Sequence, residues 1–114
     1  MVTAFYRLTK VEEAEDSDIG EWELRNHDFH EALMSGCESP WLQRFHATLY
    51  DQHKRYRNIC LHTSSVPRNL HAEHQQLHDT ALARDVDAHL AATEAHIRRT
   101  AEITRKVLAE AHQQ

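Results

Sequence analysis

The chain contains little of the residue types that most often interrupt or cross-link a fold: it has two glycines, two prolines and two cysteines in 114 residues. This scarcity of glycine and proline, with abundant alanine, leucine, glutamate, arginine and histidine, favours helices, and no strand-like run competes with them. Because Cys37 and Cys60 form no CxxC pair, we expect free, buried thiols that need no function. The sequence therefore predicts a single all-α domain with one core.

Long hydrophobic runs and an excess of positive charge are also missing. The N-terminus has no apolar segment of the signal-peptide type, and no stretch approaches the length of a membrane span. We therefore expect a cytoplasmic protein without membrane contact. Thirteen Lys and Arg residues against eighteen Asp and Glu residues give a net charge of -5. This acidic balance argues against nucleic-acid binding through the chain's own electrostatic field.

Histidine, in contrast, is abundant, with eleven residues in the chain. His30 stands out because Asn26 lies one helical turn before it, and residues four apart project from the same helix face. A second helix would present His74 and a third helix His96, as in helical bundles that hold a metal ion. The alternative is a histidine-rich surface that binds nothing, and the histidine count alone favours that alternative.

Start and stop signals divide the chain into five helical segments. We expect helices over residues 2–14, from Asp18 to Gly36, from Ser39-Pro40 to about Leu61, over residues 67–84, and from about Val86 to about Ala109. The start signals are a capping box formed by Asp18 and Glu21, proline after the N-cap Ser39, and Asp85 before the last helix. Residues 62–67 are expected to form a polar loop. In the last helix, the side chains available for packing are Leu90, Ile97, Val107 and Leu108.

The order of these signals resembles that of a known family. The motif (D/N)xxFHxxL, which opens the core of the FCD domain, resembles Asn26-His27-Asp28-Phe29-His30-Glu31-Ala32-Leu33. This domain is the C-terminal effector domain of FadR-type GntR transcription regulators. The family's downstream EH…ARD…HL signature resembles Glu73-His74, Ala83-Arg84-Asp85 and Glu94-Ala95-His96-Ile97. The resemblance covers roughly residues 18–108 and implies an antiparallel, FCD-like helical bundle.

The resemblance also implies a metal site and an effector. The metal ligands it implies are Asn26, His30, His74 and His96. Three imidazoles and an oxygen donor suit a divalent ion such as zinc or nickel. Asn26 replaces the commoner aspartate of the family, and its neutral amide predicts a less tightly held ion. The effector implied is a small carboxylic or dicarboxylic acid. The stretch from Ser39 to Arg57 is similar to the branch of carbon-starvation regulators, whose effectors include glutarate.

A basic side chain is expected to bind the effector carboxylate, and we select Arg57. Arg55 and Arg57 are two positions apart on one predicted helix, so only one of them can face the cavity. Tyr50 and His53 share the helix face of Arg57, while His71 and His78 flank His74 and are expected at the cavity rim. The alternative for the arginine is a solvated helix face.

The predicted function is that of a ligand-sensing and dimerising domain of a transcription regulator, present as a homodimer and without enzymatic activity. Family members carry a winged helix-turn-helix before this domain and usually a further long helix, and this chain shows neither in full. We therefore expect a fragment or truncated product that does not bind DNA directly. Its expected organisation is a partial helix and turn over residues 1–17, the effector- and metal-binding bundle over 18–110, and a frayed tail over 111–114.

The alternative function is a standalone metal-dependent hydrolase or a metal-binding helical protein. An open position on zinc can acidify a bound water molecule enough for hydrolysis. However, Glu73 and Glu94 are predicted to lie on different helix faces from the nearby His74 and His96, and neither spacing resembles HExxH. The sequence therefore offers no convincing general base.

Overall fold

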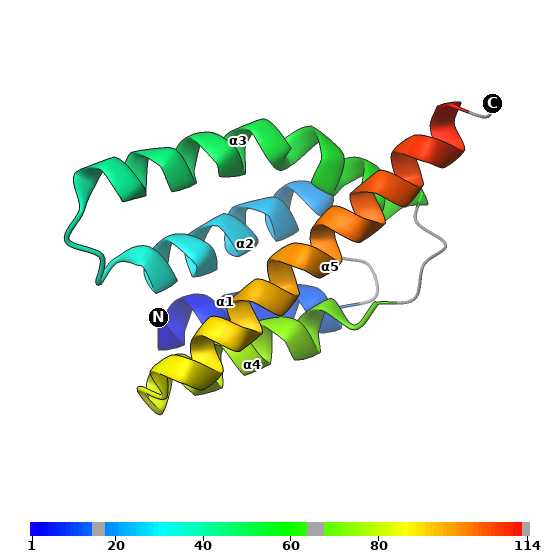
Figure 1. Ribbon diagram of the computed structural model, residues 1–114. Helices are drawn as coiled ribbons and strands as arrows, with labels where there is room; N and C mark the ends of the chain where they lie inside the picture. The colour runs from blue at the N-terminus through cyan, green and yellow to red at the C-terminus, as the bar shows by residue number, and fades with distance from the viewer. Residues whose placement is uncertain (15–17, 64–67, 113–114) are drawn as a thin grey trace.

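The computed structural model describes residues 1–14, 18–63 and 68–112 and shows five helices (Figure 1). They are α1 (Val2–Glu13), α2 (Ile19–Met34), α3 (Pro40–Thr63), α4 (Leu70–Leu82) and α5 (Val86–His112). No strand occurs in these three ranges, so the all-α prediction is confirmed. Helix α1 packs against both α2 and α4, and the long helix α5 packs against α3 and α4. In Figure 1, α5 runs diagonally across the bundle.

Two of the predicted helix starts are confirmed by their side-chain hydrogen bonds. The Ser39 hydroxyl accepts a hydrogen bond from the backbone N–H of Leu42 at 3.3 Å, which places Pro40 at the first position of α3. The Asp85 carboxylate accepts from the backbone N–H of Ala88 at 3.1 Å at the start of α5. Both side chains satisfy a backbone donor that has no partner within its helix.

The capping box predicted for α2 is wrong. Asp18 occupies the N-cap position, but its side chain makes no capping hydrogen bond. Glu21 instead pairs with Arg25 one turn later, at 2.7 Å between Oε1 and Nε. An ion pair at this spacing competes for the carboxylate that a capping box requires.

Several helix ends also differ from the sequence prediction, since α2 ends at Met34 rather than at Gly36 and α4 ends at Leu82 rather than at residue 84. Helix α4 begins at Leu70 rather than at residue 67, because the Asn69 side chain accepts from the backbone N–H of Ala72 and caps it there. Helix α3 continues to Thr63, so the first two residues of the predicted 62–67 loop are helical, and the remaining loop residues lie outside the described ranges. Helix α5 continues to His112, beyond the expected end.

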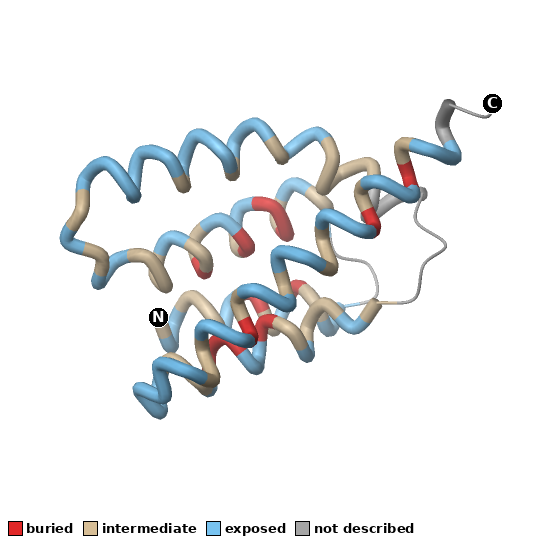
Figure 2. Tube along the Cα trace, viewed as in Figure 1, coloured by how far each residue is buried: buried red, intermediate tan, exposed pale blue. Residues whose placement is uncertain are grey.

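The core lies where α1, α2, α4 and α5 meet, and Figure 2 shows its buried residues on these helices. Its buried members are Leu8, Val11, Trp22, Phe29, Leu77 and Ala92. Helix α1 supplies two of these side chains, Leu8 and Val11, although the sequence suggested only a partial helix there. Further along α5, Ile103 and Val107 are also buried.

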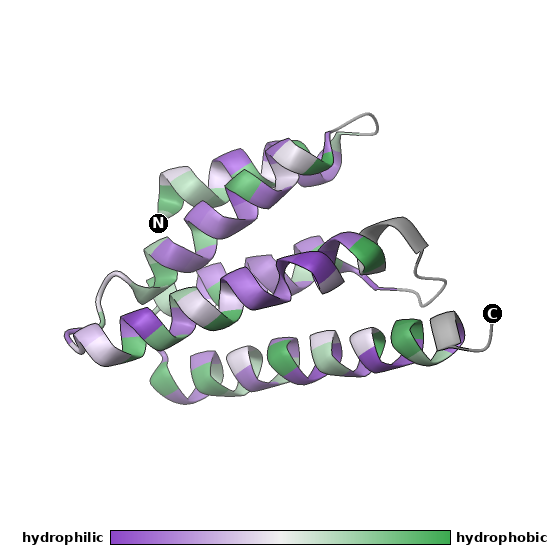
Figure 3. Cartoon of the chain, turned by 90° about the horizontal axis from the view of Figure 1, so that it is seen from above, coloured by the Kyte–Doolittle hydropathy of each residue, from purple (hydrophilic) through white to green (hydrophobic). Residues whose placement is uncertain are grey.

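Several large hydrophobic side chains remain exposed. On α3 these are Trp41, Leu42, Phe45 and Leu49. Hydrophobic positions recur along α5 (Figure 3), and its predicted packing residue Val107 is only 6% exposed. The same prediction is wrong for Leu90 and Ile97, which are both 61% exposed because they face away from α4 and the core. No helix within the described ranges is long and apolar enough to span a membrane.

Candidate metal centre

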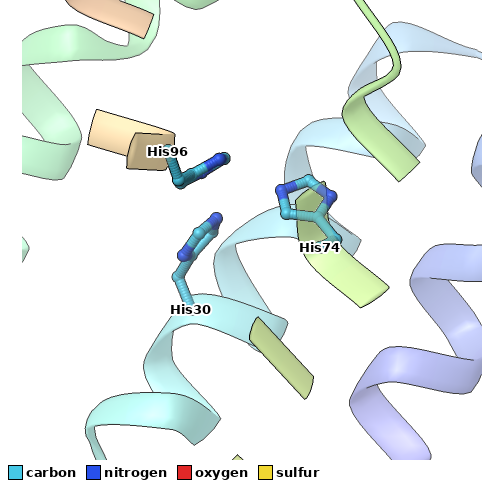
Figure 4. Close-up of side chains that lie close together, drawn as sticks. All are labelled: His30, His74 and His96. Carbon is cyan, nitrogen blue, oxygen red and sulfur yellow. The ribbon is translucent and has the colours of Figure 1, made fainter. Parts of the chain in front are cut away.

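Three histidines from three helices converge in the bundle. His30 comes from α2, His74 from α4 and His96 from α5, and Figure 4 shows their rings turned towards a common centre. The ring centroids are 5.3 Å apart for His30 and His74, 5.4 Å for His30 and His96, and 5.2 Å for His74 and His96. One nitrogen from each ring lies within 4.8 Å of the others. The structure thus places together the three imidazoles that the family resemblance selected.

A buried aromatic residue fixes two of these rings from the core side. Phe29 is completely buried, and its ring centroid lies 5.5 Å from those of both His30 and His74. His74 is itself only 1% exposed. Because Phe29 precedes His30 on α2, burial of the phenyl ring orients the helix so that His30 points into the cluster.

Carboxylates bind the outer nitrogens of two of the three histidines. The Nδ1 of His74 lies 3.1 Å from Oε2 of Glu12, and the Nδ1 of His96 lies 2.9 Å from Oε1 of Glu73. A hydrogen bond donated from Nδ1 fixes the tautomer and leaves the lone pair of Nε2 for another partner. Metal-binding histidines in proteins show this carboxylate arrangement behind the ring.

The environment of His30 and His74 favours their neutral form, which metal coordination requires. Burial and the neighbouring His74 and His96 lower the pKa of His30 well below its ordinary value. Burial also lowers the pKa of His74, although its hydrogen bond to Glu12 opposes this effect. Burial raises the pKa of Glu73, but hydrogen bonds from Arg68 and His96 outweigh it and bring the pKa to about 2. Lowered pKa values thus favour a neutral His74 ring and an ionised Glu73 carboxylate.

The lowered pKa of His30 predicts that the metal-free protein loses stability as the pH falls below about 6.5, the ordinary histidine value. In that range the unfolded chain binds a proton that the folded chain excludes, so the free energy of unfolding falls by up to about 1.4 kcal/mol per pH unit for this group. Urea denaturation of chelator-treated protein between pH 7.5 and 5.5 measures the slope. His30→Gln should flatten it, and a wild-type stability that does not change over this range would contradict the prediction.

Asn26, the fourth predicted ligand, has an oxygen that fits a metal. The residue is 2% exposed, and its Nδ2 donates to the hydroxyl of Tyr50 at 2.7 Å. Its Oδ1 is buried and makes no hydrogen bond with any described residue. A buried amide oxygen without a partner is costly unless another group completes its coordination. Asn26 lies one turn before His30 on α2, so the oxygen is on the helix face that carries the histidine.

Arg57, the predicted effector anchor, is already engaged in the structure. Its guanidinium forms a two-point ion pair with Glu23 of α2 and donates to the backbone carbonyl of Tyr50 at 2.7 Å. It also lies over the Tyr50 ring, 3.7 Å from the centroid. Tyr50 connects this group to the proposed ligand Asn26 through its hydroxyl.

An open groove of about 880 Å³ lies between α2 and α3 on this side of the bundle. Among its lining residues are Glu23, Tyr50, Lys54, Arg57 and Asn58. The Oδ1 of Asn58 is buried without a hydrogen-bond partner among the described residues. The three clustered histidines do not line the groove, but Tyr50 does, and its ring centroid lies 6.0 Å from that of His30.

The other predicted effector residues, His53, His71 and His78, contact other helices. His53 faces α5, where its Nε2 lies 3.3 Å from the hydroxyl of Thr104. His71 and His78 both stack on Phe5 of α1, with ring centroids 6.0 Å and 4.1 Å away. The structure therefore groups Arg57 with Tyr50, while α1 covers the rings of His71 and His78.

Sequence reasoning missed the charged residues around the cluster. Glu12 falls within the helix predicted over residues 2–14 but received no role there; in the structure it lies on α1, and its side chain is 5% exposed. Glu73 was considered only as a general base for its neighbour His74, yet it binds His96 across the bundle and is held by Arg68 at 2.7 Å. The position of Glu73 beside His74 in the motif could have identified it, whereas no motif lies next to Glu12, which is 62 positions from His74.

Comparison with known proteins agrees with the resemblance seen in the sequence. The FCD domain model matches residues 6–99, and the chain belongs to the FCD domain family. The chain is 38% identical over 110 residues to BphR, an uncharacterized HTH-type transcriptional regulator of Paraburkholderia xenovorans (strain LB400), a match that covers 93% of this chain and 45% of the relative. It is 36% identical over 84 residues to the HTH-type transcriptional repressor GlaR of Escherichia coli (strain K12), covering 68% and 38% of the two chains. No solved structure matches significantly.

The chain thus spans less than half the length of either of these regulators. The similarity to both supports an effector-binding domain of a GntR-type regulator. The helix-turn-helix in the names of these relatives is a feature of proteins about twice as long as this chain.

Proposed function

We propose that this chain is the sensing domain of a transcription regulator and binds a divalent metal ion together with a small carboxylate effector. The observation that carries the proposal is the convergence of His30, His74 and His96, two of which have their outer nitrogens bound by carboxylates. Zinc and nickel suit this donor set best, because both accept neutral imidazole nitrogen.

The ligands in this proposal are the Nε2 atoms of His74 and His96, one ring nitrogen of His30 and the Oδ1 of Asn26. All four donors are neutral, so the protein does not saturate the charge of a divalent ion. A bound ion would supply positive charge and open coordination positions for a carboxylate. Asn26 also positions Tyr50, because its amide nitrogen donates to the tyrosine hydroxyl.

The second end of a dicarboxylate would bind in the groove between α2 and α3, where Arg57 lies over the Tyr50 ring and the Tyr50 hydroxyl accepts a hydrogen bond from Asn26. Glu23 competes for the same guanidinium. Effector binding would therefore weaken the contact between Arg57 and Glu23, which joins α3 to α2. A change in how these helices pack is the signal that we propose for a longer regulator carrying its own DNA-binding domain.

We further propose a homodimer, in which the exposed hydrophobic residues of α3 pack against a second copy. Trp41, Phe45 and Leu49 lie on this helix and are each more than half exposed. A contiguous apolar patch of this kind is typical of protein interfaces or of aggregation. Light scattering on the purified chain distinguishes the two, and a monodisperse monomer would contradict the dimer.

The alternative function, metal-dependent hydrolysis, receives less support. The carboxylates of Glu12 and Glu73 contact outer nitrogens of the cluster, and Glu73 is also paired with Arg68. Neither carboxylate has the freedom that a general base needs to accept a proton from a metal-bound water molecule.

The effector proposal predicts that a small dicarboxylate such as glutarate stabilises the metal-loaded chain. At a hundredfold excess over its dissociation constant, the ligand should raise the free energy of unfolding by about 2.7 kcal/mol, because it binds only the folded state. Prior removal of the metal by a chelator should abolish the increment. Thermal and urea denaturation with and without metal provide the measurement.

Three variants distinguish the two proposed anchors. Glu23→Gln removes the carboxylate that competes for Arg57 and should tighten dicarboxylate binding. Arg57→Ala should weaken binding, whereas Arg55→Ala, an exposed arginine two positions earlier, should leave it unchanged. Binding that is insensitive to both the chelator and Arg57→Ala would show that the effector class or the groove is wrongly assigned.

A further inference from the structure

Glu12 connects α1 to the histidine cluster through a buried carboxylate. Its two oxygens lie 3.2 and 3.1 Å from the Nδ1 of His74 on α4, and Oε2 accepts a hydrogen bond from Trp22 Nε1 on α2 at 3.2 Å. The Nδ1 of His71 lies 3.4 Å from Oε1. One carboxylate near the end of α1 therefore contacts two other helices, and one of its partners belongs to the proposed metal centre.

The second carboxylate beside the cluster has a different charge environment. Glu73 is bound by Arg68 through two hydrogen bonds of 2.7 Å, so its negative charge is already offset. The ion pairs within the described ranges give Glu12 only histidine partners, His71 and His74, and no lysine or arginine.

A carboxylate that is 5% exposed, with no lysine or arginine partner among the described residues, carries a negative charge only at a cost in free energy. A divalent ion on the other nitrogen of His74 would supply positive charge on the far side of the ring from Glu12. The proposed ligands His30, His74, His96 and Asn26 are all neutral, so they leave the charge of such an ion uncompensated. The buried carboxylate therefore lacks a positive partner, and an ion held by the neutral ligands would lack a negative one, so each would compensate the charge of the other.

We propose that Glu12 is a positioning residue that directs His74 towards the metal and supplies the negative charge that offsets the ion, which couples metal occupancy to the docking of α1. This inference rests on the proposed metal site. Because coupling is reciprocal, metal binding stabilises the docked position of α1 by the same factor by which docked α1 tightens metal binding. Helix α1 is then the element through which occupancy of the site is transmitted to the outside of the bundle.

The matched pair Glu12→Gln and Glu13→Gln tests the inference. Both variants remove one negative charge from adjacent positions of α1, but Glu13 is exposed and Glu12 is buried against His74. Glutamine at position 12 keeps an oxygen that can accept from Nδ1 and removes only the charge. We expect Glu12→Gln to weaken zinc binding by about 10- to 100-fold in competition with a chromophoric chelator, and Glu13→Gln to change it by less than about twofold. Equal zinc affinities of the two variants would overturn the inference.

Two measurements separate a positioning role from a merely structural one. Visible absorption of the cobalt-loaded chain should change in Glu12→Gln and remain that of the wild type in Glu13→Gln, because the ligand field depends on how His74 is held. In the wild type, zinc should slow hydrogen exchange of α1 amides near Glu12. Zinc protection confined to α2, α4 and α5 would overturn the inference even if Glu12→Gln failed to fold.

Different results would contradict the proposed metal site and the role of Glu12. If the wild type binds zinc and His74→Ala loses the affinity while Glu12→Gln keeps it, the metal site stands and only the role of Glu12 is overturned. A wild-type chain whose zinc affinity survives His74→Ala overturns the site itself and the inference that rests on it.

Discussion

With zinc at a thousandfold excess over its dissociation constant, the wild-type chain should be about 4.1 kcal/mol more stable to unfolding than the chelator-treated chain. The folded state brings together His30, His74 and His96 from three separate helices, whereas the unfolded chain holds them at no fixed distance. Only the folded state therefore offers a multidentate site. Urea denaturation at fixed zinc concentration measures the increment, and elemental analysis gives the stoichiometry, which should be one ion per chain.

His74→Ala should remove most of this stabilisation. The substitution deletes the central ligand and the link to Glu12, and if binding weakens about a hundredfold, the increment at the same zinc concentration falls to about 1.4 kcal/mol. The matched control is His27→Ala. His27 lies with Asp28 and Glu31 on the exposed face of α2, a second group of side chains that could hold a cation. If His27→Ala loses the stabilisation by zinc and His74→Ala keeps it, zinc binds at that surface and the buried site is refuted.

Arg57→Ala should cost about 3–5 kcal/mol of folding free energy in the metal-free protein. The side chains of Arg57 and Glu23 are only 10% and 11% exposed, and removal of the arginine leaves the Glu23 carboxylate buried without its cation. The substitution also removes the hydrogen bond to the Tyr50 carbonyl and the contact with its ring. Because a domain of this size is stable by about 5–15 kcal/mol in total, the loss should be visible as a large shift of the urea midpoint.

A double-mutant cycle shows whether the buried charge is the cause. Glu23→Gln combined with Arg57→Ala should be markedly more stable than Arg57→Ala alone, because no uncompensated carboxylate remains. Arg55→Ala, on the exposed side of α3, should change stability by no more than about 0.5 kcal/mol. If Glu23→Gln gives no recovery, loss of packing on Tyr50 is the cause of the destabilisation and the ion pair contributes little.

The surroundings of Arg57 show which contacts of the proposed effector site can be predicted from the sequence. The helical spacing correctly placed Tyr50 and Arg57 together, since they are seven positions apart on α3 and in contact. The same reasoning gave no indication of Glu23, which lies 34 positions from Arg57 and occupies its guanidinium. His71 and His78 were chosen only because they flank His74, and their contacts with Phe5 depend on how α1 packs on α4.

The sequence by itself determined the features that depend on neighbouring residues. The scarcity of glycine and proline set the all-α class, while Ser39 and Asp85 fixed the starts of α3 and α5, because an N-cap forms within one helical turn. The motif around His30 and the downstream histidines also identified the family. The tertiary structure decided everything that requires helices distant in sequence to meet. Glu12 and His74 are 62 positions apart, and their contact exists because Leu8, Val11 and Phe29 bury α1 against the bundle. Apolar packing is non-directional, so the pattern that predicts each helix does not specify which polar side chains the packed helices bring together.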